Sequence, residues 1–293
     1  MITILGRGAW GSALASVLKT NGAEYTIWDR KSEIDPNSIV VLAIPTQAIR
    51  EVLTNNKENL KNSIIINTSK GIEKGTHKLP FQIAKEVLGD NIKYLSLFGP
   101  SFAVEVEEKL PTLVNLASIN GDNTLAEKIK KIFETDYFKV RIAGSAQAVE
   151  LSGALKNIYA ILCGISEGLG FLVNTRSQLI GHAYKETIKL CEGFGYKVEP
   201  QAIECIMGDL VLTCSSNESR NYRFGKYLVK LSVDDALQQV ASTVEGRNNI
   251  LSVPFLSEEG GIELPLAKFV YETVINDSPK TIEARFREVL LNI

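Results

Sequence analysis

Two lysines stand where a side chain could transfer a proton. Lys70 lies in the segment NTSKGIE, directly after a predicted strand, and Lys156 lies in ELSGALKN, on a long predicted helix. Lysine can protonate the alkoxide that forms when a ketone is reduced, provided that nearby cations or desolvation lower its pKa. Both lysines are therefore candidates for the proton-transfer step of a dehydrogenase, although an ordinary surface lysine is the common alternative.

A second polar cluster suits a phosphate monoester. Ser219, Arg220 and Asn221 would place a hydroxyl, a guanidinium and an amide at a predicted helix start. An arginine fork and unpaired helix N–H groups both match phosphate oxygens. An N-cap followed by a basic helical turn is the alternative. Asp209, in GDLVLTC, could orient Lys156, bind a substrate hydroxyl or cap the helix that follows it.

The N-terminus carries a glycine pattern typical of dinucleotide binding. Gly6, Gly8 and Gly11 lie between a predicted strand and an amphipathic helix. In such a unit the first glycine permits a tight turn, the second lets a pyrophosphate approach, and the third allows close helix–strand packing. A glycine turn without a ligand is the alternative.

The second predicted strand ends in charged residues that could read the adenosine ribose. Asp29 could accept hydrogen bonds from ribose hydroxyls, which favours NAD, whereas Arg30 and Lys31 could neutralise a 2′-phosphate, which favours NADP. All three could also be solvated turn charges. These residue types leave the choice between NAD and NADP open.

The elements that position these residues change character near Gly144. Before it, apolar strand candidates alternate with helices, which predicts right-handed βαβ crossovers and a doubly wound sheet. The predicted strands are 1–5, 24–29, 38–44, 64–67, 94–98, 113–117 and 138–142, with a helix at 79–88. After it, a helical stripe from Leu151 to Ile165 is followed by predicted helices at 176–190, 224–229, 234–239 and 265–275.

The predicted fold class is therefore α/β, with an N-terminal Rossmann-like doubly wound sheet followed by an all-α C-terminal domain. We expect an NAD(P)-binding domain at residues 1–143 and a helical substrate and catalytic domain at residues 144–293. A length of 293 residues suits two domains.

Composition excludes several other classes of function. A net charge of −2 gives no footprint for nucleic acid or an anionic membrane. Two histidines without an HExxH motif predict no histidine-based metal site, and four cysteines without a CxxC pair predict reduced, mostly buried thiols in a cytoplasmic protein. Because the sequence opens on a predicted strand, we expect no signal or transit peptide, and we expect no apolar run long enough to span a bilayer.

Seven blocks in order resemble the bacterial-type NAD(P)-dependent sn-glycerol-3-phosphate dehydrogenase family. They are GRGAWGSALA, SKGIE, GPSFAVE, ELSGALKN, GDLVLTC, SRNYRFG and VEGRNN, and they run from Gly6 to Asn249. The resemblance implies reversible reduction of dihydroxyacetone phosphate to sn-glycerol 3-phosphate with NAD or NADP, which feeds glycerophospholipid synthesis. It also implies a cytoplasmic homodimer.

The resemblance further implies a role for each matching position. Lys156 would be the proton donor and acceptor, with Lys70 and Asp209 as further catalytic residues. The implied substrate-binding residues are Lys70, Gly99, Ser101, Lys156, Asp209, Ser219, Arg220 and Asn221. The implied cofactor-binding residues are Gly6, Gly8, Ala9, Trp10, Gly11, Asp29, Arg30, Lys70, Ala103, Arg220 and Glu245.

This sequence departs from the family pattern in two places. Only residues 30–37 separate Asp29 from the next strand, which puts adenine contacts and a preference for NADP in doubt. The segment before Asp209 reads CIMGDL, so we expect the preceding turn to differ. Neither change touches Lys70, Lys156 or Arg220, and we expect catalysis to be retained.

Two rival functions are compatible with the same layout. A β-hydroxyacid or 6-phosphogluconate-type dehydrogenase would also have two domains and a helical-domain lysine, but the SRNYRFG block argues against it. A catalytically silent nucleotide-binding protein would not require Lys70, Lys156 and Arg220 together.

Overall fold

The computed structural model describes residues 1–28, 33–276 and 279–293. The chain divides into two compact units. Unit 1 comprises Met1–Glu73, Lys78–Glu150 and Lys197–Cys205, and unit 2 comprises Lys74–His77, Leu151–Tyr196 and Ile206–Ile293. The functional division at residues 143 and 144 stays a prediction.

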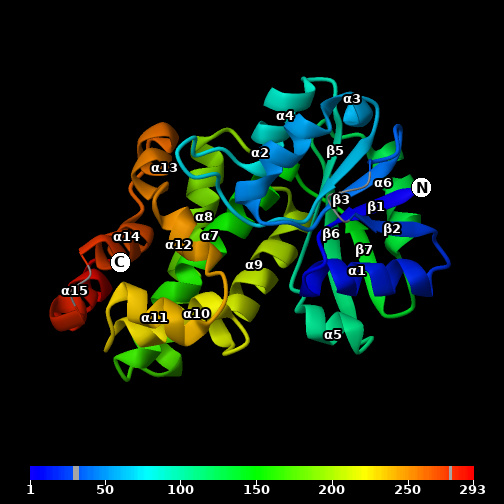
Figure 1. Cartoon of the computed structure of the whole chain (residues 1–293). Coiled ribbons are helices and arrows are strands. Elements are labelled where there is room, and N and C mark those ends of the chain that lie inside the picture. Colours follow the sequence, from blue (N-terminus) through cyan, green and yellow to red (C-terminus); the bar gives the residue numbers. More distant parts are fainter. Residues whose placement is uncertain (29–32, 277–278) are drawn as a thin grey trace. The chain divides into compact units, whose positions relative to one another are not determined.

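Unit 1 is built on a seven-stranded sheet in the order β2-β1-β3-β4-β5-β6-β7 (Figure 1). The strands are β1 (Ile2–Leu5), β2 (Tyr25–Trp28), β3 (Ile39–Leu42), β4 (Ile64–Asn67), β5 (Lys93–Phe98), β6 (Thr112–Ser118) and β7 (Phe138–Ile142). Each agrees with a predicted strand to within two residues, and the predicted fold class is confirmed.

The doubly wound sheet is not parallel throughout. β5 and β6 are antiparallel, whereas every other neighbouring pair is parallel. The segment between these two strands contains only α5 (Ala103–Glu107), a five-residue helix. A parallel neighbour requires a longer helical crossover, so this connection reverses the strand direction instead.

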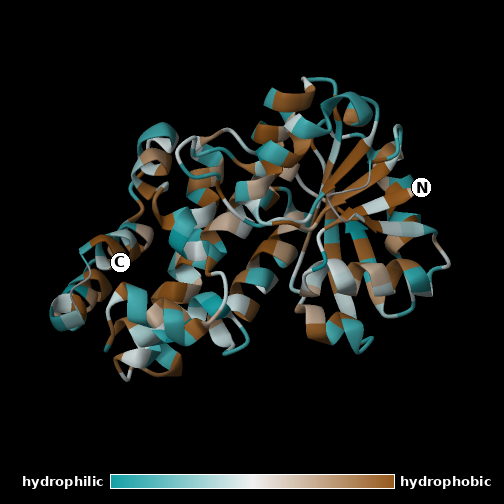
Figure 2. Ribbon diagram, viewed as in Figure 1, coloured by the Kyte–Doolittle hydropathy of each residue, from teal (hydrophilic) through white to brown (hydrophobic). Residues whose placement is uncertain are grey.

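Helices flank the sheet in two groups. α1 (Ala9–Thr20) packs beside α5 and α6 (Asn123–Phe133), and α2 (Thr46–Asn55) packs beside α3 (Lys57–Leu60) and α4 (Pro80–Leu88) (Figure 1). Strands covered in this way must be apolar, and Figure 2 shows the sheet as predominantly hydrophobic. Val40, Val41 and Leu42 of β3 are fully buried.

The shortened segment after β2 contains no helix or strand in its described residues, 33–38. Ile34 is nevertheless fully buried, and Asn37 has a φ of 59°. The left-handed region is accessible to asparagine at modest cost, which suits a tight return into β3.

Unit 2 is helical. Its elements are α7 (Ala146–Gly168), α8 (Val173–Gly193), α9 (Pro200–Ser215), α10 (Arg220–Leu228), α11 (Val233–Val240), α12 (Glu245–Ile250), α13 (Val253–Gly260), α14 (Pro265–Asn276) and α15 (Pro279–Asn292), with the first turns of α7 and α9 belonging to unit 1. The four predicted helices correspond to α8, α10, α11 and α14, and α10 begins four residues earlier than predicted.

The expectation that no apolar run could span a bilayer is wrong for α7. This helix is long and apolar enough to cross a membrane by length and composition alone, but its apolar window is 100% buried within the structure. Such burial is typical of the core helix of a globular protein. All four cysteine side chains are buried as well.

The alternative in which Asp209 caps a new helix is also wrong. α9 begins with Pro200, a favoured first-turn residue, and continues without a turn through Asp209 to Ser215. The expected turn before Asp209 is therefore absent, because CIMGDL is helical.

Two glycines allow α7 and α10 to cross closely. A Cβ on Gly164 would overlap the carbonyl oxygen of Tyr222, and a Cβ on Gly225 would overlap that of Ile161. Only residues without a side chain permit this approach. The crossing fixes α10, with Arg220 at its first position, against the helix that carries Lys156.

Candidate active site

The glycine loop of unit 1 contains two glycines that the fold requires and one that it does not. Gly6 has a φ of 121°, and a Cβ there would overlap the carbonyl oxygen of Ala43. A Cβ on Gly11 would overlap the carbonyl oxygen of Gly6. Gly8 has an ordinary φ of −70°, and a Cβ there would meet no described residue within 4 Å.

The space beside Gly8 fits an anionic ligand. Gly8 is the exposed N-cap of α1, no side chain in the described part of the chain caps that helix, and its first turn contains no acidic residue. Unpaired N–H groups at such an end attract phosphate. The loop therefore has the chemistry that a dinucleotide pyrophosphate needs.

Neighbouring residues extend this surface within unit 1. Ala9 is exposed, and Trp10 is half-buried with its indole N–H unpartnered in the described part of the chain. Ala103 begins α5, which packs beside α1. Asp29 and Arg30, the predicted ribose readers, lie outside the described residues.

Lys70 lies with Gly99 and Ser101 at the carboxyl ends of β4 and β5. Its Nζ donates to the Gly99 carbonyl oxygen at 3.4 Å and lies 5.5 Å from the centre of the Phe98 ring. Ser101 Oγ donates to the same carbonyl at 3.1 Å. This edge of an open α/β sheet is where ligands bind, so three predicted residues meet at a suitable place.

The loop after Lys70 is held by α2. Gln47 Nε2 donates to the Ile72 carbonyl oxygen at 2.8 Å, and Arg50 forms two hydrogen bonds with the Glu73 carboxylate, at 2.9 and 2.8 Å. A bidentate pair with a carboxylate restricts both orientation and distance. The far end of the Lys70 loop is thereby anchored.

In unit 2, Lys156 and Asp209 form a buried ion pair. Lys156 Nζ donates to the Asp209 carboxylate and, at 2.9 Å, to Thr213 Oγ1. Thr213 Oγ1 in turn donates to the Asp209 carbonyl oxygen at 2.7 Å. The three residues are 8%, 5% and 5% exposed. Asp209 and Thr213 share one face of α9 because they are four residues apart.

The thiol beside this pair stays neutral. Burial raises the pKa of Cys214 well above its ordinary value, although the charge of Lys156 opposes that shift. Lys156 therefore has the Asp209 carboxylate, and not a thiolate, as its anionic partner. The hydrogen bond between Lys156 Nζ and the Asp209 carboxylate is the contact that Asp209 would need in order to orient Lys156.

The start of α10 is tied to α7 and α12 through two asparagines. Asn221 Nδ2 donates to Asn157 Oδ1 at 3.0 Å, and Asn221 Oδ1 accepts from the Gly246 N–H at 2.9 Å. Asn157 Nδ2 donates to the Glu245 carboxylate at 3.3 Å. Asn157, the neighbour of Lys156, thus connects two predicted site residues, Asn221 and Glu245.

The remaining residues of the SRN block differ in exposure. Ser219 is buried, and its Oγ accepts from the Tyr222 N–H at 3.3 Å, so it serves as the N-cap weighed above. Arg220 is exposed, and within residues 1–28, 33–276 and 279–293 its guanidinium makes no hydrogen bond or ion pair. An unpaired fork beside a helix N-terminus suits phosphate.

Sequence reasoning missed Thr213 and Asn157. Thr213 was detectable because it lies one helical turn after Asp209, provided that α9 is recognised as continuous. Asn157 was visible in ELSGALKN, but only the structure shows that it connects α7 with α10 and α12.

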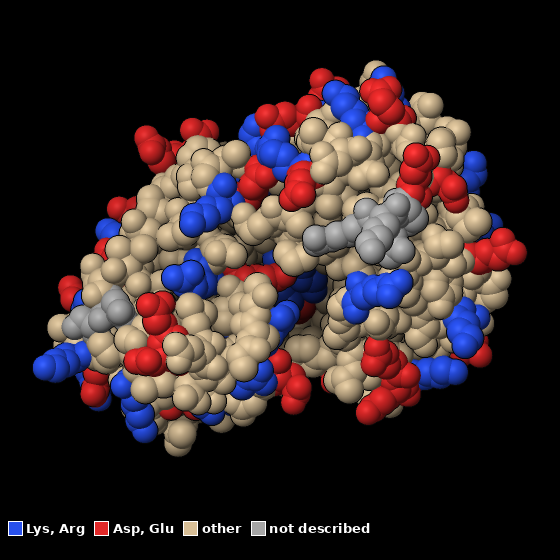
Figure 3. All heavy atoms as spheres, in the orientation of Figure 1, with Lys and Arg blue, Asp and Glu red and all other residues tan. Residues whose placement is uncertain are grey.

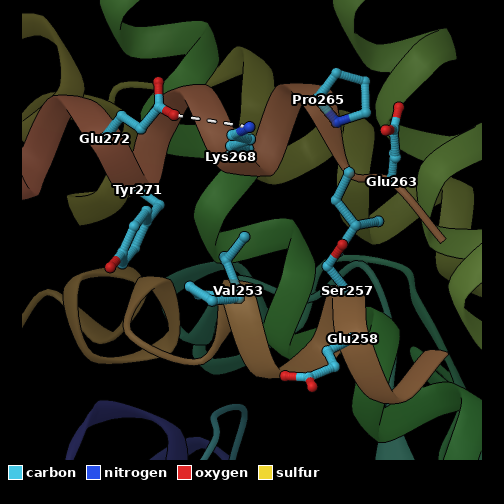
Figure 4. A pocket seen from close by; sticks show the side chains of 10 residues that line it. Val253, Ser257, Glu258, Glu263, Pro265, Lys268, Tyr271 and Glu272 are labelled. Atoms are coloured by element: carbon cyan, nitrogen blue, oxygen red, sulfur yellow. Dashed lines mark ion pairs between the residues drawn. The ribbon is translucent and has the colours of Figure 1, made fainter. Parts of the chain in front are cut away.

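Unit 2 also contains a pocket of about 480 Å³ between α13 and α14 that none of the predicted site residues lines (Figure 4). Its polar lining includes Glu258, Glu263 and Tyr271, with Lys268 paired to Glu272 at 4.0 Å.

On the face seen in Figure 3, cations and anions are interspersed, so the candidate anion site depends on local residues and not on a general basic surface.

Comparison with known proteins identifies the family. Residues 1–37 and 32–124 match the N-terminus of NAD-dependent glycerol-3-phosphate dehydrogenase, and residues 146–283 match its C-terminus. A glycerol-3-phosphate dehydrogenase (NAD(P)+) from Geobacillus thermodenitrificans is 35% identical over 94% of this chain and 90% of its own length. A second one, from Thermoanaerobacter sp., is 34% identical over 92% of this chain and 91% of its own length.

Solved structures agree. Glycerol-3-phosphate dehydrogenase from Coxiella burnetii is 30% identical, with a TM-score of 0.87 over 99% of this chain and 98% of that one. D-mandelate dehydrogenase, at 13% identity and a TM-score of 0.60, shares the fold alone. Because the N- and C-terminal matches and the relatives above 30% identity together cover most of the sequence, this chain belongs to the NAD-dependent glycerol-3-phosphate dehydrogenase family.

Proposed function

We propose that this chain reduces dihydroxyacetone phosphate to sn-glycerol 3-phosphate with NAD(P)H, and the reverse, with Lys156 exchanging the proton on the substrate oxygen. The observation that carries the proposal is the buried Lys156 ammonium held by Asp209 and Thr213. Reduction of a ketone adds a hydride to carbon and a proton to oxygen. Asp209 keeps the Lys156 side chain oriented for this proton transfer.

The glycine loop and the first turn of α1 are proposed to hold the dinucleotide in residues 1–143. When bound, the reduced nicotinamide supplies the hydride. Gly6 and Gly11 shape the loop, and Gly8 leaves room for the pyrophosphate. Ala9, Trp10 and Ala103 are proposed as further contacts, with Asp29 and Arg30 at the ribose and Lys70, Arg220 and Glu245 completing the cofactor set.

The substrate phosphate is proposed to bind at the start of α10, in the domain of residues 144–293. Arg220 offers a guanidinium that the described structure leaves unpaired, and Ser219 and Asn221 flank it. Lys70, Gly99 and Ser101 are proposed to contact the substrate from the sheet edge, where the structure brings them together.

We also propose that the enzyme is a cytoplasmic homodimer and that its product feeds glycerophospholipid synthesis. These proposals rest on family membership. Size-exclusion chromatography with light scattering tests the dimer, since a monomeric mass for the active protein would contradict it.

The reaction is tested by following the absorbance of NADH, and separately of NADPH, as purified protein meets dihydroxyacetone phosphate. We expect oxidation that requires the substrate, and the ratio of the two rates gives the coenzyme preference. A folded protein that oxidises neither coenzyme would overturn the proposed reaction. 6-Phosphogluconate with NADP+ serves as the control substrate and should give no turnover.

A further inference from the structure

A buried carboxylate in unit 1 has no role in the chemistry described so far. Glu150, near the start of α7, is 1% exposed. One carboxylate oxygen accepts from Tyr94 OH at 2.6 Å, Ser96 Oγ at 2.7 Å and Asn67 Nδ2 at 2.8 Å. The other accepts from the Phe81 N–H at 2.9 Å. Burying a carboxylate is costly without such donors, and four of them converge here.

Asn67 connects this carboxylate to the backbone next to Lys70. Its Nδ2 also donates to the Ser69 carbonyl oxygen at 3.2 Å, and its Oδ1 accepts from the Ser69 N–H at 2.9 Å. A carboxylate oxygen accepts only, so Glu150 fixes the Asn67 amide with its nitrogen inward. The amide oxygen is then left for Ser69.

We propose that Glu150 is a positioning residue for Lys70, acting through the Asn67 amide and the backbone of Ser69. The inference rests on the proposed role of Lys70 in binding substrate and coenzyme. Arg50 holds the end of the same loop at Glu73. Glu150, through Asn67, holds the other end at Ser69, next to Lys70.

The test uses Glu150→Gln, which keeps the size of the side chain. The amide nitrogen of the new glutamine cannot accept a hydrogen bond. The glutamine oxygen must therefore face the Phe81 N–H, and the glutamine nitrogen then faces Asn67. The Asn67 amide must then turn over, and it loses the bond from the Ser69 N–H. Because a small misplacement of a binding group is expensive, we expect kcat/KM for dihydroxyacetone phosphate to fall about tenfold.

A double-mutant cycle separates positioning from general stability. In a Lys70→Ala background, Glu150→Gln should lower kcat/KM by less than about twofold, because its effect passes through Lys70. Asn67→Ala should reproduce the loss, and adding it to Glu150→Gln should cause little further loss. Thermal unfolding establishes that each variant is folded.

Glu186→Gln is the matched control. Glu186 is also a buried glutamate that accepts from a tyrosine hydroxyl, at 2.9 Å, and from a backbone N–H, but it lies in unit 2. Its effect should be the same with and without Lys70. Hydrogen exchange at the Ser69 and Lys70 amides should accelerate in Glu150→Gln and stay unchanged in Glu186→Gln.

The outcomes are distinguishable. A fully active Lys70→Ala variant removes the role of Lys70 and overturns the positioning proposal with it. An impaired Lys70→Ala variant in which Glu150→Gln costs the same factor as in the native background leaves Lys70 in place and overturns the role of Glu150. A folded, fully active Glu150→Gln protein also overturns the role of Glu150.

Discussion

At the scale of single residues, the buried pair of Lys156 and Asp209 combines chemistry with a structural liability. Both side chains are almost fully buried, and each charge offsets the desolvation of the other. Removing one partner leaves an uncompensated charge, whereas replacing both does not. Catalysis and stability therefore respond differently to substitution here.

Lys156→Met should abolish most turnover, by about a hundredfold or more in kcat, because the proton donor is lost. It should also lower the free energy of unfolding by about 3–5 kcal/mol, because the Asp209 carboxylate stays buried without the countercharge of Lys156. Adding Asp209→Asn should restore stability but not activity. Urea denaturation and steady-state kinetics measure both, with Lys185→Ala, at an exposed position of α8, as the control. Equal stability of the single and double variants would contradict the pairing argument.

Arg220→Ala should lower kcat/KM for dihydroxyacetone phosphate by about tenfold to a hundredfold, because charge-assisted hydrogen bonds to phosphate are lost. Turnover of unphosphorylated dihydroxyacetone should fall by a smaller factor, because only the proposed coenzyme contact of Arg220 affects that substrate. Arg223→Ala is the matched control, since that guanidinium is already bound to the Asn217 carbonyl oxygen at 2.9 Å. An equal loss of kcat/KM on both substrates would place Arg220 outside the phosphate site.

At the scale of elements, the predictable features were those with a local cause. Strand β4 was predicted with its observed bounds because three consecutive isoleucines, followed by Asn67, suffice to define it. α9 was missed because Gly208 and Asp209 favour helix ends by themselves. Inside the protein, the contact of Asp209 with Lys156 on another helix compensates for that preference, and no local pattern contains it.

Gly225→Ala tests the close crossing of α7 and α10. The new Cβ would overlap the backbone of Ile161, so we expect a loss of about 1–3 kcal/mol in stability. Gly181→Ala is the matched control, because that helical glycine of α8 has open space around it. Alanine should stabilise it by about 0.5–1 kcal/mol. Similar unfolding midpoints for both variants would argue against the crossing.

At the scale of the whole molecule, the sequence indicated both halves of the fold but not how individual groups pair. The glycine loop, both lysines and the SRN block were named as candidate site residues from their types and spacing. The partners Thr213, Asn157 and Glu150 were not, because their contacts join elements far apart in the chain, and only the spacing of Thr213 from Asp209 along α9 is local. Tertiary hydrogen bonds leave no periodic trace in a sequence.

Stability should fall as the pH rises from about 4.5 to about 7. Burial raises the pKa of Glu186 to about 7 in the folded protein, and burial shifts that of Glu150 in the same direction. The folded state then binds protons more tightly than the unfolded state, so folding is favoured at the acid end and that advantage is lost through pH 7. Glu186→Gln should flatten the pH dependence of the thermal midpoint. If the slope of the thermal midpoint against pH is unchanged by this substitution, Glu186 does not contribute to the pH dependence of stability.

The burial of all four thiols has a practical consequence for following this enzyme at work. Dyes that react with cysteine should label the native protein slowly, so no background substitutions are needed. Cysteines introduced at Glu58 in unit 1 and Leu291 in unit 2, both well exposed, would then accept a fluorescent donor and acceptor selectively. Energy transfer between the two dyes would report, one molecule at a time, whether the separation of the units changes during turnover.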